Sequence, residues 1–195
     1  MKRVTTIAFC LIAALLTGAS MAAAQDDYAE IRELLETCAA CHGPDGAAPI
    51  EPEFPILAGQ HLHYLYVQLK DFKAGRRENE VMGEIAAGLE KEQMLLIAQF
   101  FSEQPWPGIP FKADPAVAAK GETATAAGQC VQCHLGGYEG NSRIPRVAGQ
   151  QFDYLNKTMT DFKTKARHNS PAKSTLMQSY AEDDIAAMAE FLAGL

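Results

Sequence analysis

The pentapeptide Cys-x-x-Cys-His occurs twice in the sequence, once beginning at Cys38 and again beginning at Cys130. This spacing is the attachment pattern of c-type haem. One helical turn carries both sulfur atoms to the two vinyl groups of one porphyrin and places the adjacent histidine under the iron. We therefore expect two covalently bound haem c groups, attached through Cys38, Cys41, Cys130 and Cys133, with His42 and His134 as the proximal iron ligands.

Two other uses of the four cysteines are open. Two Cys-x-x-Cys pairs can hold one tetrahedral zinc ion, and they can form redox disulfides of the thioredoxin-like kind. A zinc site does not need a histidine directly after each pair, however, and no βαβ pattern surrounds either motif. The repeated pentapeptide therefore favours haem.

Residues 1–24 are typical of an export signal. Lys2 and Arg3 form a basic start, residues 7–16 an apolar middle and residues 21–24 a small-residue end. Cleavage at the end of this segment would release the rest of the chain into the periplasm. The remaining sequence has no second long apolar run, and all its cysteines lie in the two pentapeptides. Covalent haem would occupy those thiols in an oxidising compartment.

The sequence is acidic, with 24 Asp and Glu against 17 Lys and Arg, a formal net charge of −7. The charge becomes −9 when Lys2 and Arg3 leave with the signal. An acidic surface argues against nucleic acid as a partner and favours proteins with a basic docking face. We expect redox proteins as partners, and any association with a membrane would be peripheral, through those partners.

The second part of the chain repeats the first. Residues 145–169 overlie residues 55–79 with 11 of 25 positions identical, which indicates duplication of one haem domain. No strand-like alternation of useful length occurs, so we expect an all-α fold. The expected division is a first domain over residues 25–103, a Pro-rich linker over residues 104–115 and a second domain over residues 116–195.

In each domain, helices are expected to lead into the haem motif and to follow it. Apolar residues spaced for one buried face predict helices over about residues 61–74 and 89–102. The segment before the second motif, residues 120–129, is a weaker helix because it is rich in Thr and Ala and contains Gly128. Trp106, in the linker, is expected to pack between the domains rather than to bind a ligand.

The sixth iron ligand decides the chemistry of each haem. An open position would bind small ligands or peroxide, whereas methionine closes it and raises the reduction potential. Met94, Met159 and Met188 fall on the apolar faces of predicted helices, so we expect them in the core. Met82 and Met177 lie in irregular segments before the last helix of each domain, 40 and 43 residues after the proximal histidines. We expect them to be the sixth ligands.

Other side chains compete for these positions. His168 lies in the same segment as Met177 and would give bis-histidine ligation with a lower potential, although its repeat partner is not a histidine. Lys173 is a further competitor. His61 and His63 begin a helix beside polar neighbours, and we expect them to be solvated rather than bound to iron.

Four residues of the repeat could support the haem groups from outside the ligand set. A ligating histidine usually donates its other ring nitrogen to a carbonyl, and the matched Pro55 and Pro145 could each present one. Arg77 and Arg167 could pair with haem propionates, or they could be ordinary surface residues.

The order of these motifs resembles the dihaem cytochrome c4 family over essentially all of the chain after the signal. The first haem motif is followed by Pro-Ile-Leu-Ala-Gly-Gln at residues 55–60, a Tyr-Leu helix, Asp-Phe-Lys-Ala-Gly-Arg-Arg at residues 71–77, Met82 and an amphipathic last helix. The whole order is used twice around a Pro-rich linker. The second copy departs from the pattern. Residues 170–176 lengthen the segment before Met177, and residues 180–184 form a shorter connection to the final helix.

The resemblance implies two class I cytochrome c domains that face each other, with haems close enough for rapid electron exchange. It implies a periplasmic shuttle between a quinol-oxidising complex and a terminal oxidase. The family's attachment cysteines match Cys38, Cys41, Cys130 and Cys133, and its axial ligands match His42, Met82, His134 and Met177.

Three functions are compatible with such a chain. The first is an electron carrier that makes or breaks no substrate bond. The second is the cytochrome subunit of a flavocytochrome c sulfide dehydrogenase or a similar flavoprotein dehydrogenase; the sequence has no glycine pattern for a flavin or nucleotide, so the chemistry would belong to a partner chain. The third is a dihaem peroxidase, which needs a vacant or displaceable ligand. We favour the first.

Overall fold

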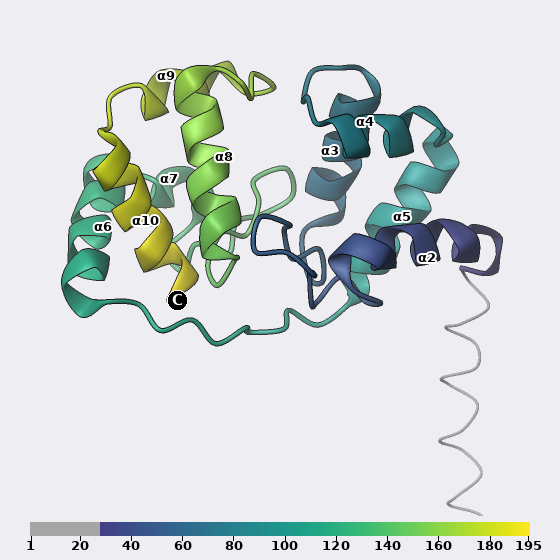
Figure 1. Ribbon diagram of the computed structural model, residues 1–195, viewed down its shortest axis with the longest axis horizontal. Helices are drawn as coiled ribbons and strands as arrows, with labels where there is room; N and C mark the ends of the chain where they lie inside the picture. Colours follow the sequence, from purple (N-terminus) through teal and green to yellow (C-terminus); the bar gives the residue numbers. More distant parts are fainter. Residues whose placement is uncertain (1–27) are drawn as a thin grey trace, which may run out of the picture.

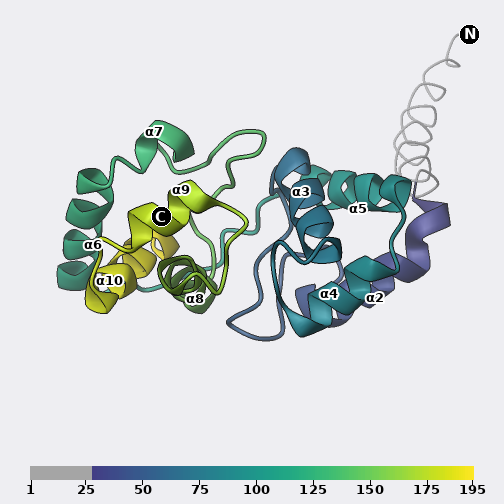
Figure 2. The ribbon, with the colours of Figure 1, turned by 90° about the horizontal axis from the view of Figure 1, so that it is seen from above.

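The helices form two lobes that lie side by side (Figure 1; Figure 2 shows them from above). The computed structural model describes residues 28–195, so the predicted export signal, residues 1–24, lies outside it. The first half of the described chain contains η1 (Ala29–Ile31), α2 (Arg32–His42), α3 (Leu62–Lys73), α4 (Glu80–Ala87) and α5 (Lys91–Glu103). The second half contains α6 (Pro115–Ala127), α7 (Val131–His134), α8 (Phe152–Thr164), α9 (Pro171–Met177) and α10 (Glu182–Ala193).

The expected all-α fold is confirmed. Residues 28–195 contain no β-strand, and their only ladder-like contacts are two isolated bridges, of which one joins Arg77 to Arg167. No helix in this part of the chain is long and apolar enough to cross a membrane.

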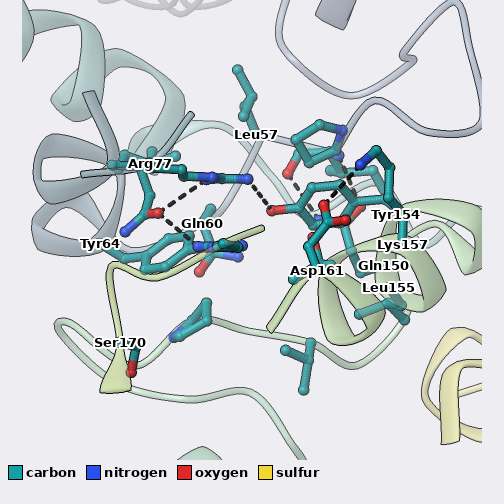
Figure 3. A pocket seen from close by; sticks show the side chains of 18 of the residues that line it. Leu57, Gln60, Tyr64, Arg77, Gln150, Tyr154, Leu155, Lys157, Asp161 and Ser170 are labelled. Atoms are coloured by element: carbon teal, nitrogen blue, oxygen red, sulfur yellow. Dashed lines mark hydrogen bonds and ion pairs between the residues drawn. The ribbon is translucent and has the colours of Figure 1, made fainter. Parts of the chain in front are cut away.

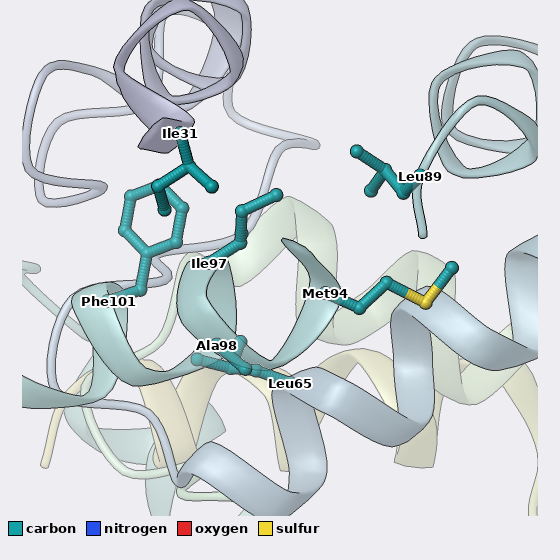
Figure 4. Packing of buried hydrophobic residues seen from close by; sticks show 7 residues of the cluster. All are labelled: Ile31, Leu65, Leu89, Met94, Ile97, Ala98 and Phe101. Carbon is teal, nitrogen blue, oxygen red and sulfur yellow. The ribbon is translucent and has the colours of Figure 1, made fainter. Parts of the chain in front are cut away.

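The core of the first half forms between α3, α5 and η1 (Figure 4). α5 turns one apolar face inward, and this face meets Leu65 from α3 and Ile31 from η1. The buried residues of that face are Met94, Ile97, Ala98 and Phe101. The i, i+3, i+4, i+7 spacing of these side chains is the reason that α5 packs as an amphipathic helix. Met94 is therefore a core residue, as expected.

The second half is organised around α10, which packs against both α6 and α8. Gly121 allows the close approach of α6, because a Cβ atom there would collide with the carbonyl oxygen of Ala187. Asp114 caps α6 by accepting hydrogen bonds from the backbone N–H groups of Ala116 and Val117, and Pro115 occupies the first turn. The helix expected to be weak is thus well formed, and it ends just before Gly128.

The segments that carry Met82 and Met177 are helical, so the expectation of irregular structure there is wrong. In α4 the side chain of Asn79 accepts a hydrogen bond of 2.9 Å from the backbone N–H of Met82 and caps the helix. α9 begins with Pro171, which is preorganised for a first helical turn. Met188 and Met159 belong to the apolar clusters of the second half, as expected.

Trp106 packs between the halves, as the sequence predicts. Its backbone lies against Gly59 of the first half, and its indole ring lies against Gly149 and under the guanidinium group of Arg146 in the second half. Two buried glutamines, Gln60 and Gln150, also join the halves, because the side chain of each forms hydrogen bonds with the backbone of the other half. The two lobes are therefore joined by polar contacts as well as by the packing of Trp106.

Replacing Gly59 by alanine should destabilise the protein more than replacing Gly75. Both glycines have positive φ angles, +65° and +67°, so each alanine incurs the left-handed backbone cost of about 1–2 kcal/mol. Only at Gly59 would the new Cβ also lie 2.8 Å from the backbone nitrogen of Trp106, whereas nothing lies within 4 Å at Gly75. We expect Gly59→Ala to lower the free energy of unfolding by a further ~1–3 kcal/mol. Urea unfolding of the haem-loaded protein measures the difference, and equal losses would contradict the assigned packing of Trp106.

Candidate functional site

A cavity of about 1100 Å³ lies between the halves and is lined by both of them. This volume exceeds the roughly 300–1,000 Å³ of ordinary small-molecule pockets. Its wall includes the ends of α2 and α7 and parts of α4 and α9. All eight residues predicted to hold haem lie on that wall: Cys38, Cys41, His42, Met82, Cys130, Cys133, His134 and Met177.

The first cysteine of each motif, Cys38 and Cys130, is placed as a partly buried thiol on the cavity wall. All four cysteines are free, and burial raises the pKa of the Cys38 thiol to about 11 and also raises the pKa of Cys130. Zinc binding and disulfide exchange both use the thiolate form. A thiol with a raised pKa is therefore poorly suited to zinc binding and to disulfide exchange, although the raised pKa does not hinder a thioether link.

The two cysteine pairs also lie too far apart for one shared zinc site. One pair is on α2 and the other is at α7, in separate lobes (Figures 1 and 2). No cluster of three or more His, Cys, Asp or Glu side chains suited to a metal ion occurs in residues 28–195. The geometry thus disfavours the four-cysteine zinc site that the sequence left open.

Each motif histidine is oriented by a proline carbonyl, as predicted. The Nδ1 atom of His42 lies 3.0 Å from the Pro55 oxygen, and that of His134 lies 2.9 Å from the Pro145 oxygen. A carbonyl oxygen only accepts, so Nδ1 carries the proton and Nε2 keeps its lone pair. Burial lowers the pKa of both imidazoles, which favours their neutral form. A neutral imidazole with a free Nε2 is the form that binds a metal.

The candidates for the sixth position separate clearly. Met82 and Met177 both line the cavity, and Met177 is anchored in a cluster with Phe162 and Met188. His168 is exposed and is not part of the wall, which weakens it as a competitor. Lys173 does line the cavity, one helical turn before Met177.

The two histidines that begin α3 differ from one another. His63 is exposed, as expected. His61 is half-buried, and its Nε2 atom lies 2.8 Å from the carbonyl oxygen of Glu139 in the other half. The expectation of a solvated His61 is therefore wrong, because this side chain belongs to the interface.

A polar group, here called the interface cluster, lies where the cavity meets both halves. Its members are Tyr64, Gln68, Arg77, Tyr154, Arg167 and Asn169. Figure 3 shows Arg77 of the first half reaching Tyr154 of the second, with Tyr64 beside them. The reciprocal contact joins Arg167 to Tyr64. Both pairs occupy matched positions of the repeat, so the interface is nearly symmetric.

Neither arginine of the interface cluster is ion-paired: the nearby carboxylate of Asp71 accepts from Asn169 but forms its ion pair with Arg76. Arg167 is only 5% exposed, and its hydrogen-bond partners are the neutral side chains of Asn169, Tyr64 and Gln68. This burial rules out the surface role that the sequence left open for Arg167. Burial alone would raise the pKa of Tyr154, but the guanidinium groups of Arg77 and Arg167 outweigh it and lower this pKa to about 7. Such a site favours an anionic group.

These residues fit two haem c groups. Thiols lie on the wall, neutral imidazoles present Nε2, methionines line the same cavity, and buried cations are suited to carboxylates. Sequence reasoning missed the tyrosines and glutamines that join the halves. Their identity at matched repeat positions was the signal that could have found them.

Comparison with known proteins agrees with this geometry. Residues 28–103 match the Cytochrome c family. Cytochrome c4 of Thiocapsa roseopersicina is 36% identical over 172 residues, covering 81% of this chain and 86% of that protein. The thiosulfate dehydrogenase electron acceptor of Stutzerimonas stutzeri is 30% identical over 175 residues, covering 81% of this chain and 78% of that protein.

A solved structure is also similar. Reduced recombinant cytochrome c4 from Pseudomonas stutzeri superposes with a TM-score of 0.76 at 30% identity, and the match covers 88% of this chain and 97% of that one. Similarity of this extent reaches across both lobes and the cavity between them. The chain belongs to the cytochrome c4 family of dihaem c-type electron carriers.

Proposed function

We propose that the protein shuttles single electrons between redox proteins of the periplasm, in the direction from a quinol-oxidising complex or dehydrogenase to a terminal oxidase. The observation that carries this proposal is the pair of matched motif ends that face one cavity, each with a histidine whose Nδ1 is held and whose Nε2 is free. When bound, each haem supplies a one-electron ferric–ferrous couple. The order of residues 1–24 supports the periplasmic location.

Each residue of the site has one role in this proposal. Cys38 and Cys41 attach the first haem and Cys130 and Cys133 the second. The axial ligands are His42 with Met82 and His134 with Met177. The chain divides into domains over residues 25–103 and 116–195, joined by the linker over residues 104–115.

The supporting residues favour electron transfer over ligand chemistry. Met177 is 7% exposed and packed against Phe162 and Met188, so its position is held by the core. A ligand held in this way need not move when the iron changes oxidation state, which keeps reorganisation small. Peroxidase chemistry would need a displaceable ligand instead. Arg77 and Arg167 would hold haem propionates within the interface cluster, because charge-assisted bonds to carboxylates are strong.

Charge divides unequally between the halves, and this division supports a basic docking partner. Residues 28–103 carry 13 acidic and 6 basic side chains, a formal charge of −7 with histidines neutral, whereas residues 104–195 carry 9 of each. Glu53, Glu78 and Glu80 are exposed and lie on the first-half wall of the cavity. A partner with basic residues would therefore be steered to the first half.

A second function, as the haem subunit of a dehydrogenase complex, is favoured by one specific observation. A relative that covers most of this chain is named a thiosulfate dehydrogenase electron acceptor. Purification of the protein from its native host under mild conditions separates the two functions. A free shuttle would be recovered alone, whereas copurification of a dehydrogenase in fixed ratio would favour the subunit role.

Replacing Met82 or Met177 by histidine tests the axial ligands one haem at a time. Each variant should lose roughly half of the visible band of methionine sulfur bound to ferric iron, and the double variant all of it. The reduction potential of the altered haem should fall, because imidazole donates more strongly and stabilises ferric iron. Visible spectroscopy and potentiometry measure both effects, after mass spectrometry confirms two haem additions.

Met94→Leu is the matched control, since Met94 is a buried core residue away from the cavity and the change nearly conserves volume. It should leave the band intact. An unchanged band in Met177→His would contradict the assignment and would point to Lys173, which lines the same cavity.

Neutralising the rim of the first half should slow reaction with cationic partners. We expect Glu53→Gln/Glu80→Gln to reduce the rate of oxidation by the cationic complex tris(1,10-phenanthroline)cobalt(III) by about threefold or more at low ionic strength, with the effect lost in high salt. The control Glu122→Gln/Asp153→Asn removes two exposed charges from the second half and should change the rate less. Stopped-flow oxidation measures the rates. Equal slowing by both pairs would contradict docking on the first half.

A further inference from the structure

The peptide groups Pro55–Ile56 and Pro145–Arg146 form hydrogen bonds at both ends. The Pro55 oxygen accepts from Nδ1 of His42 at 3.0 Å, and the N–H of the same peptide group, on Ile56, donates to Oε1 of Gln150 at 2.8 Å. Because a peptide group is planar and conjugated, the two bonds polarise one another. The Gln150 oxygen therefore makes the Pro55 carbonyl a stronger acceptor for His42.

The second half contains the same chain of bonds with the partners exchanged. The Pro145 oxygen accepts from Nδ1 of His134 at 2.9 Å, and the N–H of Arg146 donates to Oε1 of Gln60 at 2.9 Å. Each chain of bonds thus begins at a histidine of one half and ends at a glutamine of the other.

Both glutamine side chains are buried in the interface and held there by hydrogen bonds. Gln60 and Gln150 are each 3% exposed. Their amide nitrogens donate back to the opposite backbone, Gln150 to the Ile56 oxygen at 3.0 Å and Gln60 to the Arg146 oxygen at 2.9 Å. Two bonds to one residue fix the side chain in place, so its Oε1 atom is held on the peptide N–H.

We propose that Gln150 and Gln60 are positioning residues that act across the interface, Gln150 on His42 and Gln60 on His134, so that each haem has a reduction potential set in part by the other half. This inference rests on the proposed function, in which these histidines are the proximal ligands. A histidine that donates a stronger Nδ1–H bond is a more basic ligand. A more basic ligand stabilises ferric iron and lowers the potential.

Isosteric substitution of each glutamine in the full-length, haem-loaded protein tests this coupling. Gln150→Met keeps the side-chain volume but removes both hydrogen bonds. It should shift the potential of the first haem to a more positive value and leave the second unchanged. Gln60→Met should do the reverse. Haem-resolved potentiometry measures the shifts, and proton NMR of the ferrous protein should show the Nδ1–H resonance of the opposite half's histidine moving upfield.

His61→Ala is the control for a general weakening of the interface, because it removes a bond between the halves that touches neither proline peptide group. It should leave both potentials unchanged. A shift confined to the substituted half, equal shifts in both haems, or no shift would overturn the proposal. A wild-type protein that carries fewer than two haems, or that shows no methionine band, would instead refute the proposed function itself.

If Gln150→Met does not retain both haems, Gln150→Glu carries the test. Glutamate keeps an acceptor oxygen for the N–H of Ile56, so the first potential should stay at or below the wild-type value. A positive shift in this variant would overturn the proposal.

Discussion

The hydrogen bond from each histidine Nδ1 to a proline carbonyl is the interaction on which the rest of the structure depends. It determines the imidazole tautomer and leaves Nε2 without a proton on a side chain that lines the cavity. The bond holds only if the loop that presents the carbonyl is itself held. In both halves the loop is clamped by a glutamine from the opposite half. The sites and the interface are therefore one structure, and neither half contains everything that positions its own histidine.

Burial of the cofactor and burial of charge between the halves depend on one another. Each half is small and has a modest apolar core, so a large apolar cofactor would supply much of the surface burial that a domain of this size needs. Burying Arg167 among neutral partners is costly unless an anion joins them. Carboxylates entering the cavity beside the interface cluster would offset that cost. Cofactor binding and association of the two halves should thus stabilise one another.

Most of the site could be predicted from the sequence because its chemistry is local. The spacing of Cys38, Cys41 and His42 lies within one helical turn, and the matched prolines of the repeat predicted the carbonyls that hold the two histidines. The ligand roles of Met82 and Met177 stay predictions, and both side chains line the cavity. The helices with clear apolar faces followed from periodicity.

The contacts between halves could not be predicted in the same way. The role of His61, the crossed tyrosine–arginine pairs and the glutamine clamps all depend on how two lobes meet, which no periodic pattern encodes. α4 and α9 were missed because they are short, and only a capping Asn79 and an initial Pro171 mark them. Identical polar residues at positions 60 and 150, without a ligand role, were the available signal.

Duplication preserved the framework of the halves while their surroundings diverged. The charged residues four positions before Met82 and Met177 differ in sign between the halves. They are Glu78 and Lys173, and both line the cavity. Burial is the main reason that the pKa of Lys173 is lowered to about 8, so its amine stays mostly protonated at neutral pH. A cation near iron disfavours the ferric state, and an anion favours it. Two sites with the same proposed ligands thus differ in their electrostatic environment. A carrier with two haems can use such a difference to direct electrons from one half to the other.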